Sequence, residues 1–233
     1  ENNICELHIE RNSGHSLVGN IYLGVVRRVL PGMQSEFIDI GLERAAFLHI
    51  VDVLEQRRNP EETQRIEHML FEGQSVLVQV IKDPINTKGA RLSTQISLAG
   101  RFLVHLPQED HIGISQRIED DAERNSLRER LTNLLPEDAC HGYIIRTNAE
   151  NATDEQLLSD IHYLTKVWEH IQEQAKIQPP ETLLYQDLPL SLRVLRDMFS
   201  LDTQKILVDS TENHRRMRSE EHTSELQSPL IIS

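Results

Sequence analysis

The amino-acid sequence predicts an α+β fold in which a small five-stranded β-barrel precedes a unit of helices and short strands. Between residues 17 and 98, short segments rich in β-branched residues alternate with turn sequences such as Pro31-Gly32 and Asn86–Gly89. After Gly100, apolar residues recur at helical spacing along two longer stretches. The change of pattern near residue 100 therefore separates two parts of different architecture.

Five strands and one interruption are expected in the first part. The stretch 55–71 is charged and has few apolar positions, so we interpret it as an exposed, partly helical insertion. Five short strands broken by one insertion are typical of the oligonucleotide-binding (OB) fold. A strand at 4–9 comes first, and the barrel strands are expected at 20–30, 34–40, 45–48, 75–82 and 91–97.

The second part contains a long helix with a distinct start. Thr153 and Gln156 form a capping box, and the apolar stripe that follows extends to about residue 176. An earlier helix ends at Pro136, because proline disrupts a helix interior. The expected elements are a strand at 102–106, a helix at 120–135, a strand at 142–146, a helix at 153–176, a helix at 188–199 and a strand at 205–208.

The chain is acidic, with 24 Lys and Arg against 37 Asp and Glu and a formal net charge of −13. A simple nucleic-acid-binding domain is usually basic, so this charge argues against uniform affinity for nucleic acid. The excess lies mostly in the helical part, because residues 15–98 contain nine Lys and Arg and ten Asp and Glu. A local cationic site on the barrel is therefore compatible with the composition.

The sequence contains no motif of a catalytic or metal centre. Cys5 and Cys140 lack metal-binding spacing, and the 11 histidines are scattered. Neither a nucleophile with a matched base nor a glycine-rich phosphate loop is found. No run approaches the ~20 apolar residues that a membrane span requires. Two separate thiols without a secretory signal indicate a reduced, cytoplasmic protein.

Two phenylalanines of the barrel are candidates for base stacking. Strand alternation places Ile38 and Ile40 on one face and Phe37 on the other, so Phe37 is exposed if the isoleucines form the core. Phe47 belongs to the next strand, and exposed rings beside cations suit single-stranded nucleic acid. A buried Phe37 in a small barrel is the alternative interpretation.

Several cations have positions suited to phosphate. Lys88 lies in a tight turn near the expected aromatic face, and Lys82 and Arg91 are weaker candidates of the same kind. Arg146 and Thr147 end an apolar strand, where a guanidinium fork and a hydroxyl group could clamp a terminal phosphate. The alternatives are a solvated turn lysine and a surface arginine paired with a nearby carboxylate.

Four sequence blocks together resemble the amino-terminal half of the ribonuclease E/G family, from about Ile4 to Asp209. They are GNIYLGVVRRVLPGMQSEFIDIGLERAAFLH, VQVIKDPINTKGARLSTQISLAGRFLV, GISQRIE and IIRT, in the order found in the family. The resemblance implies an S1-like OB barrel at 16–98 and a 5′-sensor region at 99–185. It also implies that 1–15 and 186–217 are two pieces of one RNase H-like domain.

The resemblance assigns roles residue by residue. It implies that the barrel contacts RNA through four side chains and that a separate pocket binds the 5′-monophosphate. The RNA contacts are Phe37, Phe47, Lys82 and Lys88, and the sensor residues are Arg146, Thr147, Gly100 and Val104. Two departures stand out, since Leu23 replaces the usual lysine of GNIYKG and Glu36 replaces a small residue. The loss of a lysine at Leu23 is expected to weaken RNA binding.

The family resemblance implies that the whole protein is a Mg-dependent endoribonuclease of rRNA maturation and mRNA decay. In the family, magnesium-binding aspartates and a zinc-binding interchain cysteine pair belong to later domains that this chain lacks, and the whole protein is a dimer or tetramer. The expected ligand is single-stranded RNA with a 5′-monophosphate, without a cofactor on this segment. A non-catalytic S1-type RNA-binding regulatory module and an acidic interaction protein are the alternatives.

The C-terminal segment is expected to be foreign to the protein. Residues 218–228 read RSEEHTSELQS, which resembles a translated sequencing adapter. We therefore expect 218–233 to be a non-native tail and exclude it from the fold prediction.

Overall fold

The computed structural model describes residues 4, 7–9, 16–53, 65–136, 142–198, 203 and 205–215. The chain divides into two compact units, one formed by 17–187 and the other by 1–16 together with 188–233. Helix α5 (Leu190–Met198) belongs to the second unit. Among the described residues, no helix has both the length and the apolar character needed to cross a membrane.

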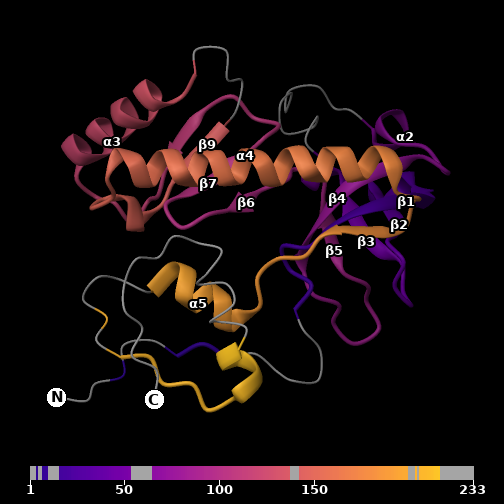
Figure 1. The fold of residues 1–233 in the computed structure, drawn as a ribbon. Coiled ribbons are helices and arrows are strands. Elements are labelled where there is room, and N and C mark those ends of the chain that lie inside the picture. Colours follow the sequence, from indigo (N-terminus) through magenta and orange to yellow (C-terminus); the bar gives the residue numbers. More distant parts are fainter. Residues whose placement is uncertain are drawn as a thin grey trace. The chain divides into compact units, whose positions relative to one another are not determined.

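A closed five-stranded β-barrel forms one end of the larger unit (Figure 1). The strands pair in the order β1-β2-β3-β5-β4, and β4 closes the barrel by pairing with β1. A sixth strand, β10, pairs with the first residues of β1. The strands are β1 (Ile21–Leu30), β2 (Ser35–Asp39), β3 (Ala46–His49), β4 (Ser75–Lys82), β5 (Arg91–Ser93) and β10 (Thr182–Tyr185). Three short helices connect them, η1 (Pro31–Met33), η2 (Ile50–Asp52) and α2 (Ile66–Met69).

The barrel encloses its own apolar core. Alternate residues of each strand point inward, as expected for strands with one buried face. Val26, Ile38, Leu48 and Leu92 are at most 1% exposed within this core. The residues between them face outward, where they contact either solvent or other elements of the unit.

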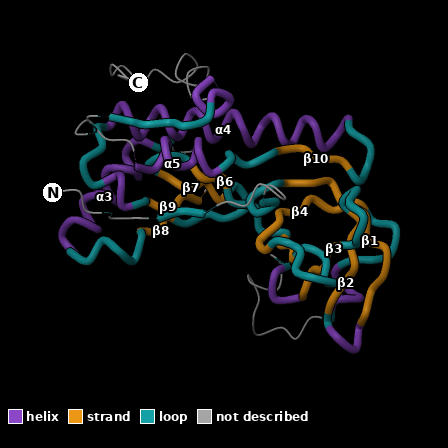
Figure 2. The backbone as a smooth tube through the Cα atoms, turned by 90° about the horizontal axis from the view of Figure 1, so that it is seen from below, coloured by secondary structure: helices purple, strands orange, loops and turns teal. Residues whose placement is uncertain are grey.

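A second, four-stranded sheet lies at the other end of the larger unit, and two helices pack with it (Figure 2). Its order is β6-β7-β9-β8, and β8 is parallel to β9. The elements are β6 (Leu98–Ala99), β7 (Leu103–Leu106), β8 (Ile112–Ile114), α3 (Asp121–Leu134), β9 (Gly142–Ile145), η3 (Thr147–Ala149) and α4 (Asp154–Ile177).

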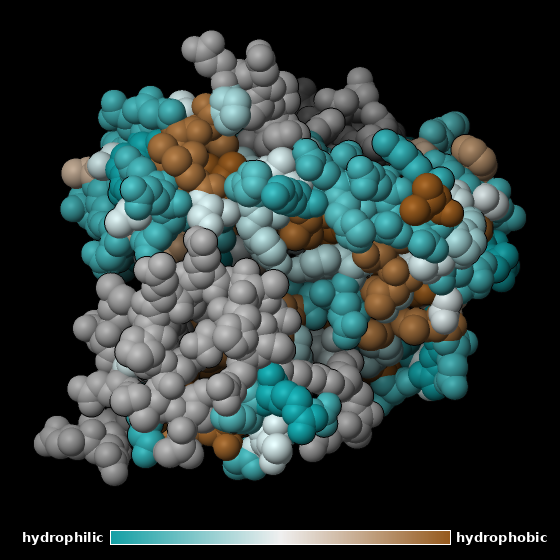
Figure 3. Space-filling model, viewed as in Figure 1, coloured by the Kyte–Doolittle hydropathy of each residue, from teal (hydrophilic) through white to brown (hydrophobic). Residues whose placement is uncertain are grey.

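Helix α4 connects the second sheet with the barrel. The Thr153 side chain and Gln156 form the capping box that the sequence predicted. The buried stripe of α4 packs into a core that also contains Ile21 of β1 and the partly buried Leu77 of β4. The outer face of the helix is mainly hydrophilic (Figure 3). Helix α4 therefore covers one side of the barrel. The side formed by β2, β3 and β5 carries exposed residues such as Phe37, and we call it the open side.

The α+β class, the five barrel strands and the main helices of the larger unit are confirmed. The predicted strand 91–97 is wrong beyond Ser93, and β6, β8 and β10 were not predicted. All three missed strands are short, and β10 pairs with a segment about 160 positions earlier in the chain, which local periodicity cannot reveal.

Other expectations need correction. Residues 205–208 form one isolated bridge at Ile206 and not a strand, and the described residues of 4–9 are exposed and outside any strand. The insertion is not wholly exposed, because Ile66 and Leu70 are 0% and 7% exposed in the barrel core. Several calls lie outside the described residues, namely 55–64 of that insertion, both cysteines and the expected tail at 218–233.

Candidate nucleic-acid interface

One cross-strand row on the open side of the barrel places two aromatic rings between cations. Residues that pair in register point to the same face of a sheet. We call this set the aromatic row; from β1 across the barrel to β4 it consists of Arg28, Phe37, Phe47, Arg91 and Lys82. Residues next to the row on the same strands, such as Glu36, Leu48 and Leu92, point into the barrel.

The two phenylalanines of the row form an exposed ring pair. Phe37 is 36% exposed and Phe47 is half-buried, so the alternative of a fully buried Phe37 is not observed. Their ring centroids lie 6.2 Å apart in an edge-to-face arrangement at 65°. The His49 ring lies 6.4 Å from Phe47, and its Nδ1 accepts a hydrogen bond from the Val51 amide. Flat rings in this position offer stacking surfaces for unpaired bases.

The cations of the row differ in their partners. The Arg91 guanidinium contacts the buried carboxylate of Asp52 at 2.7 Å. Lys82 and Arg28 are exposed and form no ion pair within the part of the chain that the structure describes. The row therefore keeps positive charge at both ends, although the whole chain is acidic.

Lys88 lies in an exposed turn beside the row. The turn closes through reciprocal backbone hydrogen bonds between Ile85 and Lys88. Gly89 follows it, and a Cβ at this position would lie 2.0 Å from the Ala45 carbonyl oxygen. Only glycine therefore lets the turn approach the start of β3, the strand that carries Phe47.

Leu23 does not belong to the aromatic row. It is 9% exposed and pairs with Leu77 of β4 and Thr182 of β10, on the covered side of the barrel. The expectation that the loss of a lysine here weakens RNA binding stays a prediction.

The predicted sensor residues gather at one end of the second sheet. The Arg146 amide donates to the Phe102 carbonyl at 2.9 Å, and its guanidinium donates to the Gly100 carbonyl. Thr147 begins η3 directly after Arg146. Val104 is half-buried on β7 and pairs with Ile144 of β9. The structure thus brings Gly100 and Arg146 into contact and places Thr147 and Val104 on adjoining segments.

A half-buried carboxylate holds this end of the sheet together. Asp160 of α4 accepts hydrogen bonds from three consecutive amides, those of Arg101, Phe102 and Leu103, at 2.8 to 3.2 Å. Burial raises the pKa of the Asp160 carboxyl, while the three amides and the Arg146 charge oppose this rise. A Cβ on Gly100 would lie 2.5 Å from an oxygen of Asp160. Glycine at position 100 therefore makes room for the carboxylate.

A fully buried acid lies inside the barrel. Glu36 is 0% exposed, and its carboxyl oxygens find no hydrogen-bond partner among the described residues. Burial raises the pKa of the Glu36 carboxyl from 4.5 to about 7. The uncharged form is therefore favoured in the folded barrel.

No metal centre is found in the described part of the chain. Within those residues, no three His, Cys, Asp or Glu side chains lie close enough together to hold a metal ion. The family resemblance implies magnesium and zinc sites only in later domains, and the described side chains of this segment do not form such a site. No chemical step is therefore assigned to a metal here.

Sequence reasoning did not find Arg28, His49 or Asp160 as site residues. Arg28 and His49 join the aromatic rings only through strand register and packing, which periodicity does not give. Asp160 lies in a helix whose apolar stripe was recognised, but its amide partners lie almost 60 positions earlier. The only signal in the sequence was the position of Asp160 next to Ile161, which belongs to the apolar stripe of α4.

The sequence matches the model described as "Ribonuclease E/G family" over residues 97–230. This match includes more than half of the chain and runs past residue 218. The foreign origin proposed for 218–233 therefore stays a prediction.

Curated relatives extend the likeness through the barrel. Ribonuclease G of Haemophilus influenzae is 42% identical and ribonuclease G of Escherichia coli strain K12 is 43% identical, each over 212 residues. Both matches cover 88% of this chain and 43% of the relative. Ribonuclease E of Nostoc sp. is 40% identical over 219 residues, which are 94% of this chain and 31% of that relative. The chain thus spans less than half of the length of these relatives.

Proposed function

Because the chain belongs to the ribonuclease E/G family, we propose that it is the RNA-binding and 5′-end-sensing part of a ribonuclease G-like endoribonuclease. In this proposal the barrel is an S1-like OB fold that holds single-stranded RNA. The end of the second sheet binds the 5′-monophosphate of the same RNA.

The aromatic row is the observation that supports RNA binding most directly. Phe37 and Phe47 lie side by side on the open side of the barrel, with their ring centroids 6.2 Å apart. Stacking of a base on such a ring contributes about 1–3 kcal/mol and tolerates any base. Lys82 and Lys88 lie where they can neutralise phosphates, which suits a single strand with little sequence preference.

The sensor role rests on Arg146 and its surroundings. The Arg146 guanidinium donates a hydrogen bond to the Gly100 carbonyl, which restricts its position. Thr147, which carries a hydroxyl group, is the next residue in the chain. A terminal monophosphate carries more charge than an internal phosphodiester, so a fixed guanidinium discriminates between the two. Gly100 and Val104 would line the pocket.

Cleavage is proposed for the whole protein and not for this segment. A cytoplasmic, Mg-dependent dimer or tetramer that acts in rRNA maturation and mRNA decay is compatible with the relatives. Residues 1–15 and 188–217 belong to one compact unit, which supports the assignment of 1–15 and 186–217 to two pieces of an RNase H-like domain. Downstream aspartates and a cysteine pair in the complete gene would favour this enzyme over a non-catalytic RNA-binding module.

Replacement of Phe37 by alanine tests the proposal. We expect Phe37→Ala to weaken the binding of a fluorescent single-stranded RNA about tenfold, because one stacking surface is lost. The loss should be the same for RNA with a 5′-monophosphate and with a 5′-hydroxyl end. Fluorescence anisotropy measures both affinities, and circular dichroism measures the unfolding midpoint.

Tyr163→Leu is the matched control, since Tyr163 is 54% exposed on α4, outside the aromatic row. It should leave RNA affinity unchanged. A Phe37→Ala variant that unfolds would identify Phe37 as a core residue. A folded variant with wild-type affinity would contradict the proposed RNA interface.

A further inference from the structure

The aromatic row ends in an arginine to which the proposed function gives no role. Arg28 pairs with Phe37 across β1 and β2 and is exposed. Its neighbour Arg27 contacts Asp39 at 3.1 Å and also Glu181. The Arg28 side chain forms no hydrogen bond or ion pair with any residue that the structure describes. Of two adjacent arginines, therefore, one neutralises carboxylates of the protein and the other does not.

A bulge in β1 explains why both arginines face outward. The register between β1 and β2 shifts between Val26 and Arg28, so that one extra residue is accommodated there. Regular alternation would turn one of two consecutive residues inward. Beyond the bulge the alternation resumes, because Val29 packs against the barrel core. Arg28 therefore belongs firmly to the face that carries Phe37.

We propose that Arg28 binds a phosphate of the RNA beyond Phe37, so that the bound strand crosses the barrel from Lys82 to Arg28. This inference rests on the proposed RNA-binding function and extends it. Neighbouring strands lie ~4.8 Å apart, so the row of five strands spans ~19 Å. That length suits the lower end of the roughly 4 to 16 nucleotides that an OB fold covers.

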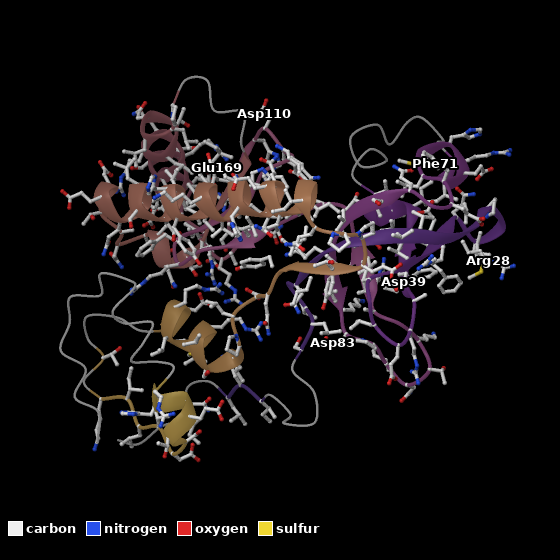
Figure 4. The ribbon with its side chains drawn as sticks, turned by 45° about the vertical axis from the view of Figure 1, so that its right-hand side comes forward. Arg28, Asp39, Phe71, Asp83, Asp110 and Glu169 are labelled. Atoms are coloured by element: carbon white, nitrogen blue, oxygen red, sulfur yellow. The ribbon has the colours of Figure 1, made fainter. Side chains whose placement is uncertain are left out.

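The chemistry of the row supports this path. Its centre consists of aromatic rings, which stack on bases, and its two ends are cations without acidic partners in the described part of the chain. A guanidinium contacts a phosphate through two parallel N–H groups, and no carboxylate of the described residues competes for Arg28. Figure 4 shows Arg28 at the side of the barrel that lies farthest from helix α3. The strand would thus leave the barrel on the side opposite the second sheet.

Salt-dependent titration of the complete 233-residue chain tests the inference. The probes are fluorescent 5′-hydroxyl oligouridines of about 4 to 16 nucleotides, which leave the 5′-sensor without a ligand. We expect Arg28→Gln to weaken binding about threefold to fivefold at about 0.1 M salt. The slope of log affinity against log salt should fall by about 0.7, the value for one phosphate contact on a single strand. Arg28→Glu should weaken binding further.

Arg128→Gln is the matched control, because Arg128 is exposed on α3 and its loss changes the net charge equally. It should leave the salt slope unchanged. Equal effects of Arg28→Gln and Arg128→Gln, with RNA binding that still depends on Phe37, would overturn the role of Arg28 alone. A wild-type chain that does not bind RNA in a salt-dependent manner would remove the proposed function as well.

Discussion

A single carboxyl inside the barrel links its stability to pH. Glu36 is fully buried between strands β1 and β3, and burial raises its pKa to about 7. In the unfolded chain the same group ionises near 4.5. Between these two values the folded protein holds a proton that the unfolded chain releases, so the free energy of unfolding falls as pH rises.

We expect Glu36→Gln to remove this pH dependence. The rise in pKa corresponds to about 3 kcal/mol in the free energy of unfolding. This contribution of Glu36 is fully present below pH 4.5 and is lost above pH 7. Relative to the variant, the free energy of unfolding of the wild type should therefore fall by about 2–3 kcal/mol between pH 5 and pH 8. Urea unfolding at several pH values measures this difference. Glu43→Gln is the control, because Glu43 is exposed in the loop after β2. The prediction would be contradicted if the difference in the free energy of unfolding between the wild type and Glu36→Gln stayed constant with pH.

Residue types and alternation were sufficient to predict the outward position of Phe37. The isoleucines at 38 and 40 are both buried, which leaves Phe37 on the other face. Arg28 could not be predicted in the same way, because a bulge interrupts the alternation of β1 just before it. Local patterns therefore predict which face of a strand a residue occupies, but register decides which residues share that face.

At the scale of elements, helix α4 positions the end of the second sheet for which the sensor role is proposed. Its capping box and apolar stripe were predicted from sequence, because both follow from positions three or four residues apart. The contact between Asp160 and the loop after β6 joins segments almost 60 positions apart and could not be predicted. The same limitation applies to β10, whose partner β1 lies far earlier in the chain.

Asp160→Asn should separate the stability of this loop from RNA binding by the barrel. An asparagine side chain keeps the size of Asp160, but it has one carbonyl oxygen and no charge to accept three amides. We expect the free energy of unfolding to fall by about 2 kcal/mol, since hydrogen bonds to charged groups contribute about 1.5–3 kcal/mol. The preference for a 5′-monophosphate should fall as well, because Asp160 positions the loop that contacts Arg146. Affinity for 5′-hydroxyl RNA should stay unchanged.

The control for Asp160→Asn is Glu169→Gln on the same helix, where the side chain is exposed (Figure 4). This variant should retain both the stability and the preference of the wild type. An Asp160→Asn variant that keeps the full preference for a 5′-monophosphate would show that the loop contacts do not position Arg146.

At the scale of the whole molecule, charge and architecture act in opposite directions. A formal net charge of −13 repels nucleic acid at long range. The near-neutral barrel and its aromatic row offset this repulsion locally. RNA binding is therefore expected to depend on contacts in two places, the row on the barrel and the cluster around Arg146, which lie in the same compact unit.

Two sites in one unit lead to a prediction about RNA length. An RNA that is too short to reach both sites gains little from its 5′-monophosphate, because it binds at one site or the other. A longer RNA can occupy both sites at once, so that its second contact forms within the complex. Its overall affinity is then the product of the two single-site affinities and an effective concentration that is often in the millimolar range. We expect the affinity ratio of 5′-monophosphate to 5′-hydroxyl RNA to rise in a step as the oligonucleotide is lengthened. Anisotropy titration of paired oligonucleotides of increasing length measures this ratio.

Arg146→Ala provides the matched comparison for this prediction. Without the guanidinium the ratio should stay near one at every length, while the unfolding midpoint changes little. In the wild type, the length at which the ratio rises gives the number of nucleotides between the sensor and the barrel. A ratio that exceeds one but does not change with length would mean that the two sites bind separate RNA molecules, because only a strand that bridges both sites benefits from their linkage.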